Sequence, residues 1–407
     1  MLRQPFLFSN CNIFCIFAIA EKNIDIMKHL LLIATLMATL LTTTTAKAQA
    51  PSTLEREIVS GPFKAGHIQG IAVDANKEYI YYSYTTMLIK TDRKGNIVGT
   101  VTGLLGHLGD LDYNAADGRV YGSLEYKNDA IGRGILNMEK SNRKLDNAFY
   151  IAIFDVERIN RIGMDAEKDG IMTTVYLPTV LDDYLAEVEL GSEKKAHRLG
   201  CSGIDGVAFG PKFGSTAGKE YLTVAYGIYN ELDRSDNDYQ VLLQYDVTSW
   251  AKYEKPLSQD AMHQQGPKKP MGQYFAFTGN TNYGVQNLEY DAYTRSWLLA
   301  VYKGSKKQYP NYSLFAVDAA AKPVKQALQG VPYIKKGAVV ALKQAGMKDE
   351  KTGLRGWMFP VGSTGMASLG DGYFYFSHNY NSEQGQGSTI RMYRYSERPD
   401  AAFDLVK

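Results

Sequence analysis

Four ionisable residues of this 407-residue chain carry the side chains that enzymes use most often for proton transfer. They are His67, His107, Glu125 and His378, and each stands beside a short apolar or aromatic segment. Histidine and carboxylate groups serve as general acids and bases because proteins can tune their pKa values toward neutral pH. We therefore predict that these four residues form a reacting centre.

A second set of polar and aromatic residues occupies similar positions and can hold a ligand through hydrogen bonds or ring contacts. These predicted substrate-binding residues are Gln69, Asp110, Lys127, Asp205, Tyr226, Gln286, Asn287, Tyr302 and Lys303. Structural roles are the alternative, because Asp and Asn beside a strand often cap turns. Glu125 and Lys127 are two residues apart on an extended segment, which puts both side chains on one face.

Three kinds of chemistry are open to these residues. A carboxylate pair drawn from Glu125, Asp110 and Asp205 can act as acid and base in glycoside hydrolysis. A His or Tyr base, with a Lys that neutralises a uronate carboxylate, can support a lyase reaction. The three histidines together with Glu125 can bind a divalent cation such as calcium, although no H-x-H or HExxH spacing supports a metal. No cofactor is assigned.

The candidate residues lie in or beside a sequence repeat. Its copies are HIQGIAVD (67–74), HLGDLDYN (107–114), GIDGVAFG (203–210), GVQNLEYD (284–291) and a shorter GMASLGD (365–371). Each copy is followed by an aromatic-rich run and then by a third alternating run. Such short segments, rich in β-branched and aromatic residues and bounded by Gly, Asp and Asn, are typical of β-strands.

Five sequential units of about four strands predict an all-β fold, a five-bladed β-propeller. The repeats start 40, 96, 81 and 81 residues apart, so a sixth blade within the 96-residue interval is the alternative. We expect a strand at 57–60 to complete the last blade. The insertions should be a charged loop at 130–147, a short helix at 180–190 and a helix-bearing excursion at 332–357.

The first strand of each unit is composed of small and apolar residues, which suits an inner strand around a central channel. Residues just before the first strands and just after the second strands should then meet at one end of that channel. Ligand sites commonly form where such loops converge. The repeat therefore predicts that the candidate residues share one site.

The amino-terminal part predicts export. Residues 27–50 combine a basic start, a short apolar run and A-x-A cleavage patterns, as in a secretory signal peptide. Residues 1–26 are then an upstream extension, and 51–407 a single propeller domain in a periplasmic or extracellular compartment. The apolar run is too short to cross a bilayer comfortably, so no stable membrane insertion is expected.

Composition limits the partners. The whole chain has 45 basic and 43 acidic side chains, of which four basic and two acidic ones lie in residues 1–50. The predicted mature chain therefore has 41 of each. A basic surface for nucleic acid is therefore not expected. Cys201 would be the single cysteine of the mature chain, so no internal disulfide can form. We predict a monomer that binds a small molecule or an oligosaccharide.

Several phrases, among them GLLGHLGDLDYN, GRVYGSLEYK and YGVQNLEYD, resemble those of a family of secreted bacterial β-propeller proteins. The resemblance spans nearly the whole predicted mature chain and implies export and the propeller, but no activity. The phrase GIDGVAFGP is also similar to the inner strands of metal-dependent gluconolactonase-type propellers. The Glu, Asn and Asp metal ligands of that group have no clear counterparts here.

The sequence thus predicts an exported carbohydrate-active enzyme, a glycoside hydrolase or a polysaccharide lyase. Two alternatives stay open, namely a non-catalytic propeller that binds glycans or proteins, and a metal-dependent esterase or lactonase.

Overall fold

The computed structural model describes residues 53–279 and 282–407. The predicted extension at 1–26 and signal peptide at 27–50 lie outside the described residues. Within them, no helix has the length and apolar character needed to cross a membrane.

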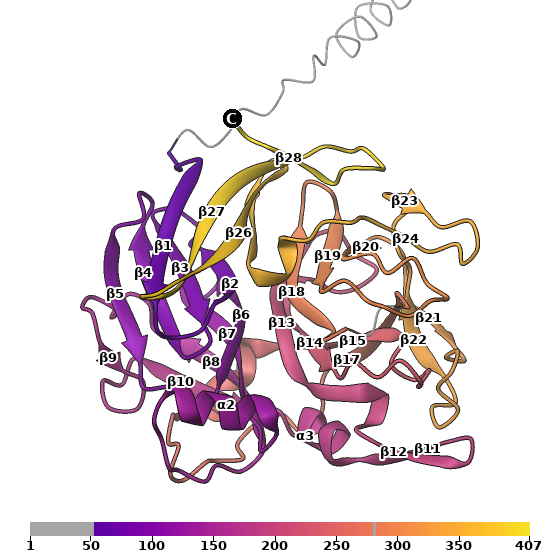
Figure 1. Ribbon diagram of the computed structural model, residues 1–407, viewed down its shortest axis with the longest axis horizontal. Helices are drawn as coiled ribbons and strands as arrows, with labels where there is room; N and C mark the ends of the chain where they lie inside the picture. The colour runs from indigo at the N-terminus through magenta and orange to yellow at the C-terminus, as the bar shows by residue number, and fades with distance from the viewer. Residues whose placement is uncertain (1–52, 280–281) are drawn as a thin grey trace, which may run out of the picture. The chain divides into compact units, whose positions relative to one another are not determined.

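Five inner strands form a closed ring, and each belongs to its own sheet. They are β2 (Ile68–Val73), β6 (His107–Asn114), β13 (Cys201–Pro211), β18 (Val285–Asp291) and β25 (Met366–Gly370). Each packs against the next one, and β25 packs against β2, which closes the ring. The chain is therefore a five-bladed β-propeller (Figure 1). The six-bladed alternative is wrong, because the 96-residue interval contributes one inner strand and one blade.

The blades differ in the number of their outer strands. Blade 1 contains β2, β3 (Tyr79–Tyr84), β4 (Met87–Asp92), β5 (Ile97–Thr102) and β9 (Met164–Asp165). Blade 2 contains β6, β7 (Arg119–Tyr126), β8 (Ala148–Phe154), β10 (Met172–Tyr176) and β16 (Lys255–Pro256). Blade 3 contains β13, β14 (Glu220–Ile228), β15 (Tyr239–Tyr245), β17 (Gly272–Phe277), β22 (Gly337–Val340) and β21 (Val324–Gln326). Blade 4 contains β18, β19 (Ser296–Val301) and β20 (Leu314–Asp318).

Blade 5 joins the two ends of the described chain. It contains β25, β26 (Tyr373–Ser382), β27 (Gly385–Tyr395), β28 (Phe403–Leu405) and β1 (Glu57–Phe63). The antiparallel pairing of β1 with β27 sets Glu57 opposite Arg391 and Ile58 opposite Ile390. Figure 1 shows this pair as an indigo strand beside a yellow one. The prediction that a strand at 57–60 completes the last blade is confirmed.

The core lies between the blades, which explains why the second strands are aromatic and buried on both faces. Between blades 3 and 4, for example, the fully buried Trp297 of β19 packs against Phe213, with ring centroids 5.0 Å apart. Aromatic rings bury large apolar areas, so they suit a strand that is covered by a neighbouring blade on each side.

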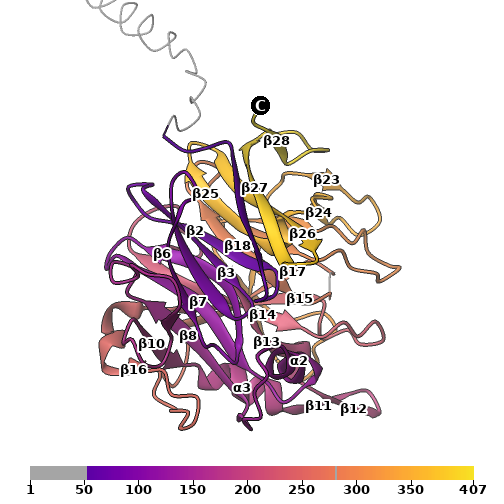
Figure 2. The ribbon, with the colours of Figure 1, turned by 60° about the vertical axis from the view of Figure 1, so that its left-hand side comes forward.

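The insertions match the sequence predictions only in part. The segment 130–147, predicted as a charged loop, begins with α2 (Ala130–Met138), whose first turn is capped by Asp129. The helix predicted at 180–190 is α3 (Pro178–Leu185), followed by the hairpin β11 (Glu187–Leu190) and β12 (Glu193–Ala196). In both views α2, α3 and the hairpin lie at the lower end (Figures 1 and 2).

The helix predicted within 332–357 is wrong. That segment holds β22 and the short pair β23 (Met347–Lys348) and β24 (Arg355–Gly356). Its Val339 and Val340 favour a strand, and β22 joins blade 3 by parallel pairing with β17. The segment thus forms a strand of the blade 3 sheet instead of a helix. Short 3-10 turns complete the described elements: η1 (Arg198–Gly200), η2 (Val247–Lys252) and η3 (Gly362–Thr364).

Candidate active site

A pocket of about 390 Å³ lies where the starts of the inner strands converge. We call it the mouth pocket. It is lined by His67, Gln69, Thr85, His107, Glu125, Lys127, Ile131, Ser202, Asp205, Tyr283, Gln286 and Tyr302. Eight of the thirteen residues predicted from the sequence are among these twelve, so the expected convergence at one site does occur.

β-Bulges occur in four of the inner strands at the position of a candidate residue. The pairing of the first strand with its second strand shifts register at the bulge, which contains Gln69 in β2, Asp110 in β6, Asp205 in β13 and Gln286 in β18. A bulge bends the strand and re-aims a side chain. Gln69, Asp205 and Gln286 line the mouth pocket, whereas Asp110 does not, so the neighbouring strands also decide where the re-aimed side chain points.

The deepest part of the pocket holds four ionisable groups in contact range. Lys127 Nζ lies 2.5 Å from Glu125 Oε1 and donates to the carbonyl oxygen of Ser202 at 2.9 Å. His107 Nδ1 lies 3.7 Å from Glu125 Oε1 and 3.7 Å from Asp205 Oδ1. The second carboxyl oxygen of Glu125, Oε2, accepts from the backbone N–H of Ile204 at 3.0 Å. These bonds fix Glu125 in place.

Of the two carboxyl groups, that of Asp205 is more accessible to a ligand. Its side chain is 14% exposed, whereas that of Glu125 is 3% exposed. Gln286 Nε2 donates to Asp205 Oδ2 at 2.8 Å, which leaves Oδ1 on the side of His107. The carboxyl groups of Asp205 and Glu125 thus form a buried pair, and that of Asp205 faces the pocket.

Burial sets the protonation of the group. It raises the pKa of Glu125 to about 7 and that of Asp205 to about 6, in both cases against the lowering effect of Lys127. Burial, with Lys127 and His67, lowers the pKa of His107 to about 3, so this imidazole is neutral. Lys127 Nζ also lies 4.0 Å from Asp129 Oδ2, so three carboxyl groups surround one ammonium. The raised pKa values of Glu125 and Asp205 favour retention of a proton on this pair near neutral pH.

A divalent cation fits this group poorly. One ligand atom each from His107, Glu125 and Asp205 lies within 4.8 Å of the other two, and His107 Nδ1 has no hydrogen-bond partner among the described residues. However, the ammonium of Lys127 already sits against Glu125 Oε1, the oxygen nearest His107. A cation at that oxygen would face a second positive charge at short range. The metal set predicted from sequence also fails, because His378 lies elsewhere.

Asp110 and Asn287, predicted to bind substrate, are instead structural. Asp110 Oδ2 accepts from the backbone N–H groups of Val207 at 3.0 Å and Leu288 at 2.9 Å, and thereby joins three blades. Asn287 Nδ2 donates to the carbonyl of Gln69 at 2.6 Å. Both side chains are almost fully buried. The inner strands pack so closely that a polar side chain pointing at the axis must satisfy neighbouring backbone groups.

Replacing Asp110 with Ala is expected to lower the free energy of unfolding by about 2–5 kcal/mol, because two buried N–H groups lose their acceptor. Asp110→Asn should cost less than about 1.5 kcal/mol, since it keeps a carbonyl oxygen and burial already raises the pKa of Asp110 well above its ordinary value. Urea unfolding of both variants measures the difference. Equal losses would contradict the proposed role of the acceptor oxygen.

Three further predicted residues lie away from the mouth pocket. Tyr226 is fully buried, and its hydroxyl donates to Asp183 at 2.7 Å. Lys303 is exposed outside the pocket lining. The ring of His378 stacks on Tyr393 at 5.9 Å, with Nε2 2.9 Å from the tyrosine hydroxyl. Tyr226 and His378 lie within their second strands, β14 and β26, instead of after them, and strand alternation turns both side chains away from the pocket. Lys303 does follow its second strand, β19.

The sequence prediction missed four lining residues as site members: Thr85, Ile131, Ser202 and Tyr283. Thr85 follows a second strand, so the repeat could have indicated it. Ile131 belongs to α2, whose place over the mouth depends on how the insertion folds back. No sequence signal marks Ser202 or Tyr283.

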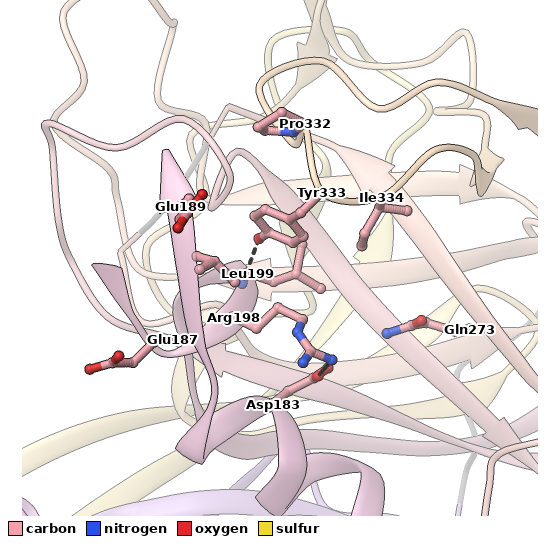
Figure 3. A pocket seen from close by; sticks show the side chains of 10 residues that line it. Asp183, Glu187, Glu189, Arg198, Leu199, Gln273, Pro332, Tyr333 and Ile334 are labelled. Carbon is pink, nitrogen blue, oxygen red and sulfur yellow. Dashed lines mark hydrogen bonds and ion pairs between the residues drawn. The ribbon is translucent and has the colours of Figure 1, made fainter. Parts of the chain in front are cut away.

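A larger hollow of about 720 Å³ lies beside α3, η1 and β11 (Figure 3). Its Arg198 is paired with the buried Asp183 at 2.8 Å, and Tyr333 accepts from the backbone N–H of Leu199 at 3.0 Å. Figure 3 shows Arg198 reaching toward Asp183 below the tyrosine. None of the thirteen predicted residues lines this hollow. The charges of Arg198 and Asp183 in its wall neutralise each other.

Comparisons with known proteins assign no activity to this chain. No protein-family model matches the sequence, and no curated protein matches it significantly. Among solved structures, the apo soluble aldose sugar dehydrogenase of Escherichia coli is 10% identical, with 83% of this chain and 99% of that chain covered and a TM-score of 0.35. The calcium structure of the Trichoderma reesei carbohydrate-active enzyme of family AA12 is 10% identical, with coverage of 79% and 80% and a TM-score of 0.35.

A protein of unknown function from Bacteroides thetaiotaomicron is 11% identical, with coverage of 82% and 72% and a TM-score of 0.30. Similarities this distant assign no substrate or reaction to the present chain.

Proposed function

We propose that this protein is an exported hydrolase that cleaves a glycosidic bond in the mouth pocket. The observation that carries the proposal is the buried Glu125–Asp205 pair, in which an oxygen of one carboxyl group lies within 4.8 Å of an oxygen of the other, and burial raises the pKa of both. Asp205 is the more exposed of the two and lines the pocket. Glycosidases use two carboxyl groups, and those that retain configuration hold them roughly 5 Å apart. The resemblance of residues 27–50 to a signal peptide supports export, which is part of the same proposal.

The residues would divide the chemistry as follows. Asp205 gives the retained proton to the glycosidic oxygen as the bond to the anomeric carbon breaks. The remaining negative charge of the pair, steadied by Lys127, stabilises the positive charge that develops on the sugar ring. Water then adds to the anomeric carbon and returns a proton to the pair. His107 separates the two carboxyls from bulk water.

Two alternatives receive less support from the same residues. A lyase needs a cation or donor to neutralise a uronate carboxylate, but Lys127 is committed to Glu125 and Lys303 lies outside the lining. A metal-dependent esterase or lactonase would place a cation where Lys127 already contacts Glu125. A non-catalytic binding propeller would not need a buried carboxyl pair with a raised pKa.

A polysaccharide and oligosaccharide screen tests the proposal. The purified protein should release reducing ends without the ultraviolet absorbance of unsaturated uronates, and added EDTA should leave the rate unchanged. Unsaturated products would select the lyase, and loss of activity on chelation would select the metal-dependent alternative. Binding without any product would favour the non-catalytic propeller.

The pH dependence supplies a further test of the retained proton. Because the pair loses its proton as pH rises past about 7, kcat/KM should fall above that pH, by up to tenfold per unit. Glu125→Gln should move this decline to lower pH, since it removes the neighbouring acidic group and leaves Lys127 to lower the pKa of Asp205 without competition from Glu125. A decline that stays in place in Glu125→Gln would argue against a proton held by the pair.

A further inference from the structure

Two tyrosine rings form a corner at the edge of the mouth pocket. The ring centroids of Tyr283 and Tyr302 are 5.8 Å apart and their planes meet at 84°. Tyr283 is 46% exposed, although a large aromatic ring gains from burial. Its φ of +65° lies in the left-handed region, which costs a bulky residue about 1–2 kcal/mol. The chain thus holds an exposed ring in a strained conformation beside the candidate reacting groups.

Gln286 connects this corner to Asp205. Its Nε2 donates to the backbone carbonyl of Tyr283 at 2.8 Å and to Asp205 Oδ2 at 2.8 Å. Gly284 lies between Tyr283 and Gln286 in the sequence and has a φ of +72°. A Cβ at this position would lie 2.3 Å from the carbonyl oxygen of Tyr226. The backbone that presents Tyr283 is therefore fixed relative to the carboxyl that would transfer the proton.

The charges of the mouth pocket exclude an anionic ligand. Of the twelve lining residues, one is a lysine and none is an arginine. Lys127 is 4% exposed and bound to Glu125 Oε1 and to the carbonyl of Ser202. A carboxylate or sulfate in the pocket would meet Asp205 and Glu125 without a cation free to compensate, which disfavours its binding.

We propose that the mouth pocket selects neutral pyranosides and stacks one sugar ring on Tyr283, with Tyr302 as a perpendicular wall. This inference rests on the proposed hydrolase function and deepens it by naming the substrate class. A pyranose whose hydroxyl groups are equatorial presents C–H groups on its faces, and these pack well on the negative face of an aromatic ring. Tyr283 is then a specificity-determining residue, and Gln286 positions it relative to Asp205.

Isothermal titration calorimetry tests this inference independently of turnover. The protein with Asp205 and Glu125 intact is titrated with thio-linked analogues of cellotetraose, xylotetraose and laminaritetraose, which resist glycosidic cleavage, and with thio-linked tetraglucuronate and tetragalacturonate as anionic counterparts. We expect at least one neutral tetrasaccharide to bind, and both anionic ones to bind at least about tenfold more weakly. Adding Tyr283→Ala should weaken the neutral ligand about tenfold.

Tyr293→Ala is the matched control. Tyr293 is 47% exposed and lies in the turn after β18, outside the residues that line the mouth pocket. Its loss should change the dissociation constant less than about twofold. Absence of binding by all neutral ligands, equal binding of anionic ones, or equal effects of the two tyrosine changes would overturn the inference.

The two proposals fail in different ways. If the unsubstituted protein binds a neutral tetrasaccharide through Tyr283 but never cleaves it, the hydrolase proposal fails and the selection of neutral pyranosides stands. If it cleaves a saccharide with no dependence on Tyr283, the hydrolase proposal stands and the present inference fails.

Discussion

Replacing Asp205 with Asn is expected to lower kcat/KM for the cleaved saccharide by about 10²–10⁴-fold, because general acid–base catalysis contributes a factor of that size. Asn keeps an oxygen that can accept from Gln286, so the pocket geometry should survive while the transferable proton is lost. Steady-state kinetics and the thermal unfolding midpoint, measured on the same preparation, separate the loss of chemistry from a loss of folding.

Lys303→Ala provides the comparison for this result. Lys303 was predicted from the sequence as a ligand contact, but it is exposed outside the mouth pocket. Its removal should change kcat/KM less than about threefold, within the range of ordinary surface substitutions. Activity that survives in Asp205→Asn and falls in Lys303→Ala would place the reacting centre elsewhere.

Lys127→Met is expected to lower the free energy of unfolding by about 3–5 kcal/mol at pH 8, because it leaves buried carboxylates without their cation. The loss should be smaller at pH 5. Without Lys127 the folded-state pKa values of Glu125 and Asp205 rise further above their unfolded values, and a carboxyl with a raised folded pKa destabilises the fold as pH increases. Urea unfolding at both pH values measures the two losses.

The double variant Lys127→Met/Glu125→Gln isolates the charge effect. It removes the cation together with its contacting carboxylate, so much of the stability lost at pH 8 should return. A double variant as unstable as Lys127→Met alone would show that packing of the lysine side chain, rather than its charge, accounts for the effect. Lys303→Met, at an exposed lysine, should leave stability within about 0.5 kcal/mol.

Local patterns were sufficient for much of the fold. The inner strands, the aromatic second strands and the closing strand at 57–60 all depend on residue type, spacing and turn residues, which are properties of short segments. Segments outside the repeat were less predictable, because α2 and β22 owe their form to the surfaces on which they fold back.

The sequence by itself determined that polar groups from several blades meet at one mouth, because the repeat places equivalent residues at equivalent points of the ring. Only the tertiary structure decided which of them face the pocket. Bulges occur at Asp205, Gln286 and Asp110 alike, yet only Asp205 and Gln286 line the pocket. The close packing of the inner strands draws Asp110 and Asn287 into backbone contacts instead. The distance between blades and the direction of a bulged side chain depend on contacts between segments far apart in the chain. A local sequence pattern does not contain information on these contacts.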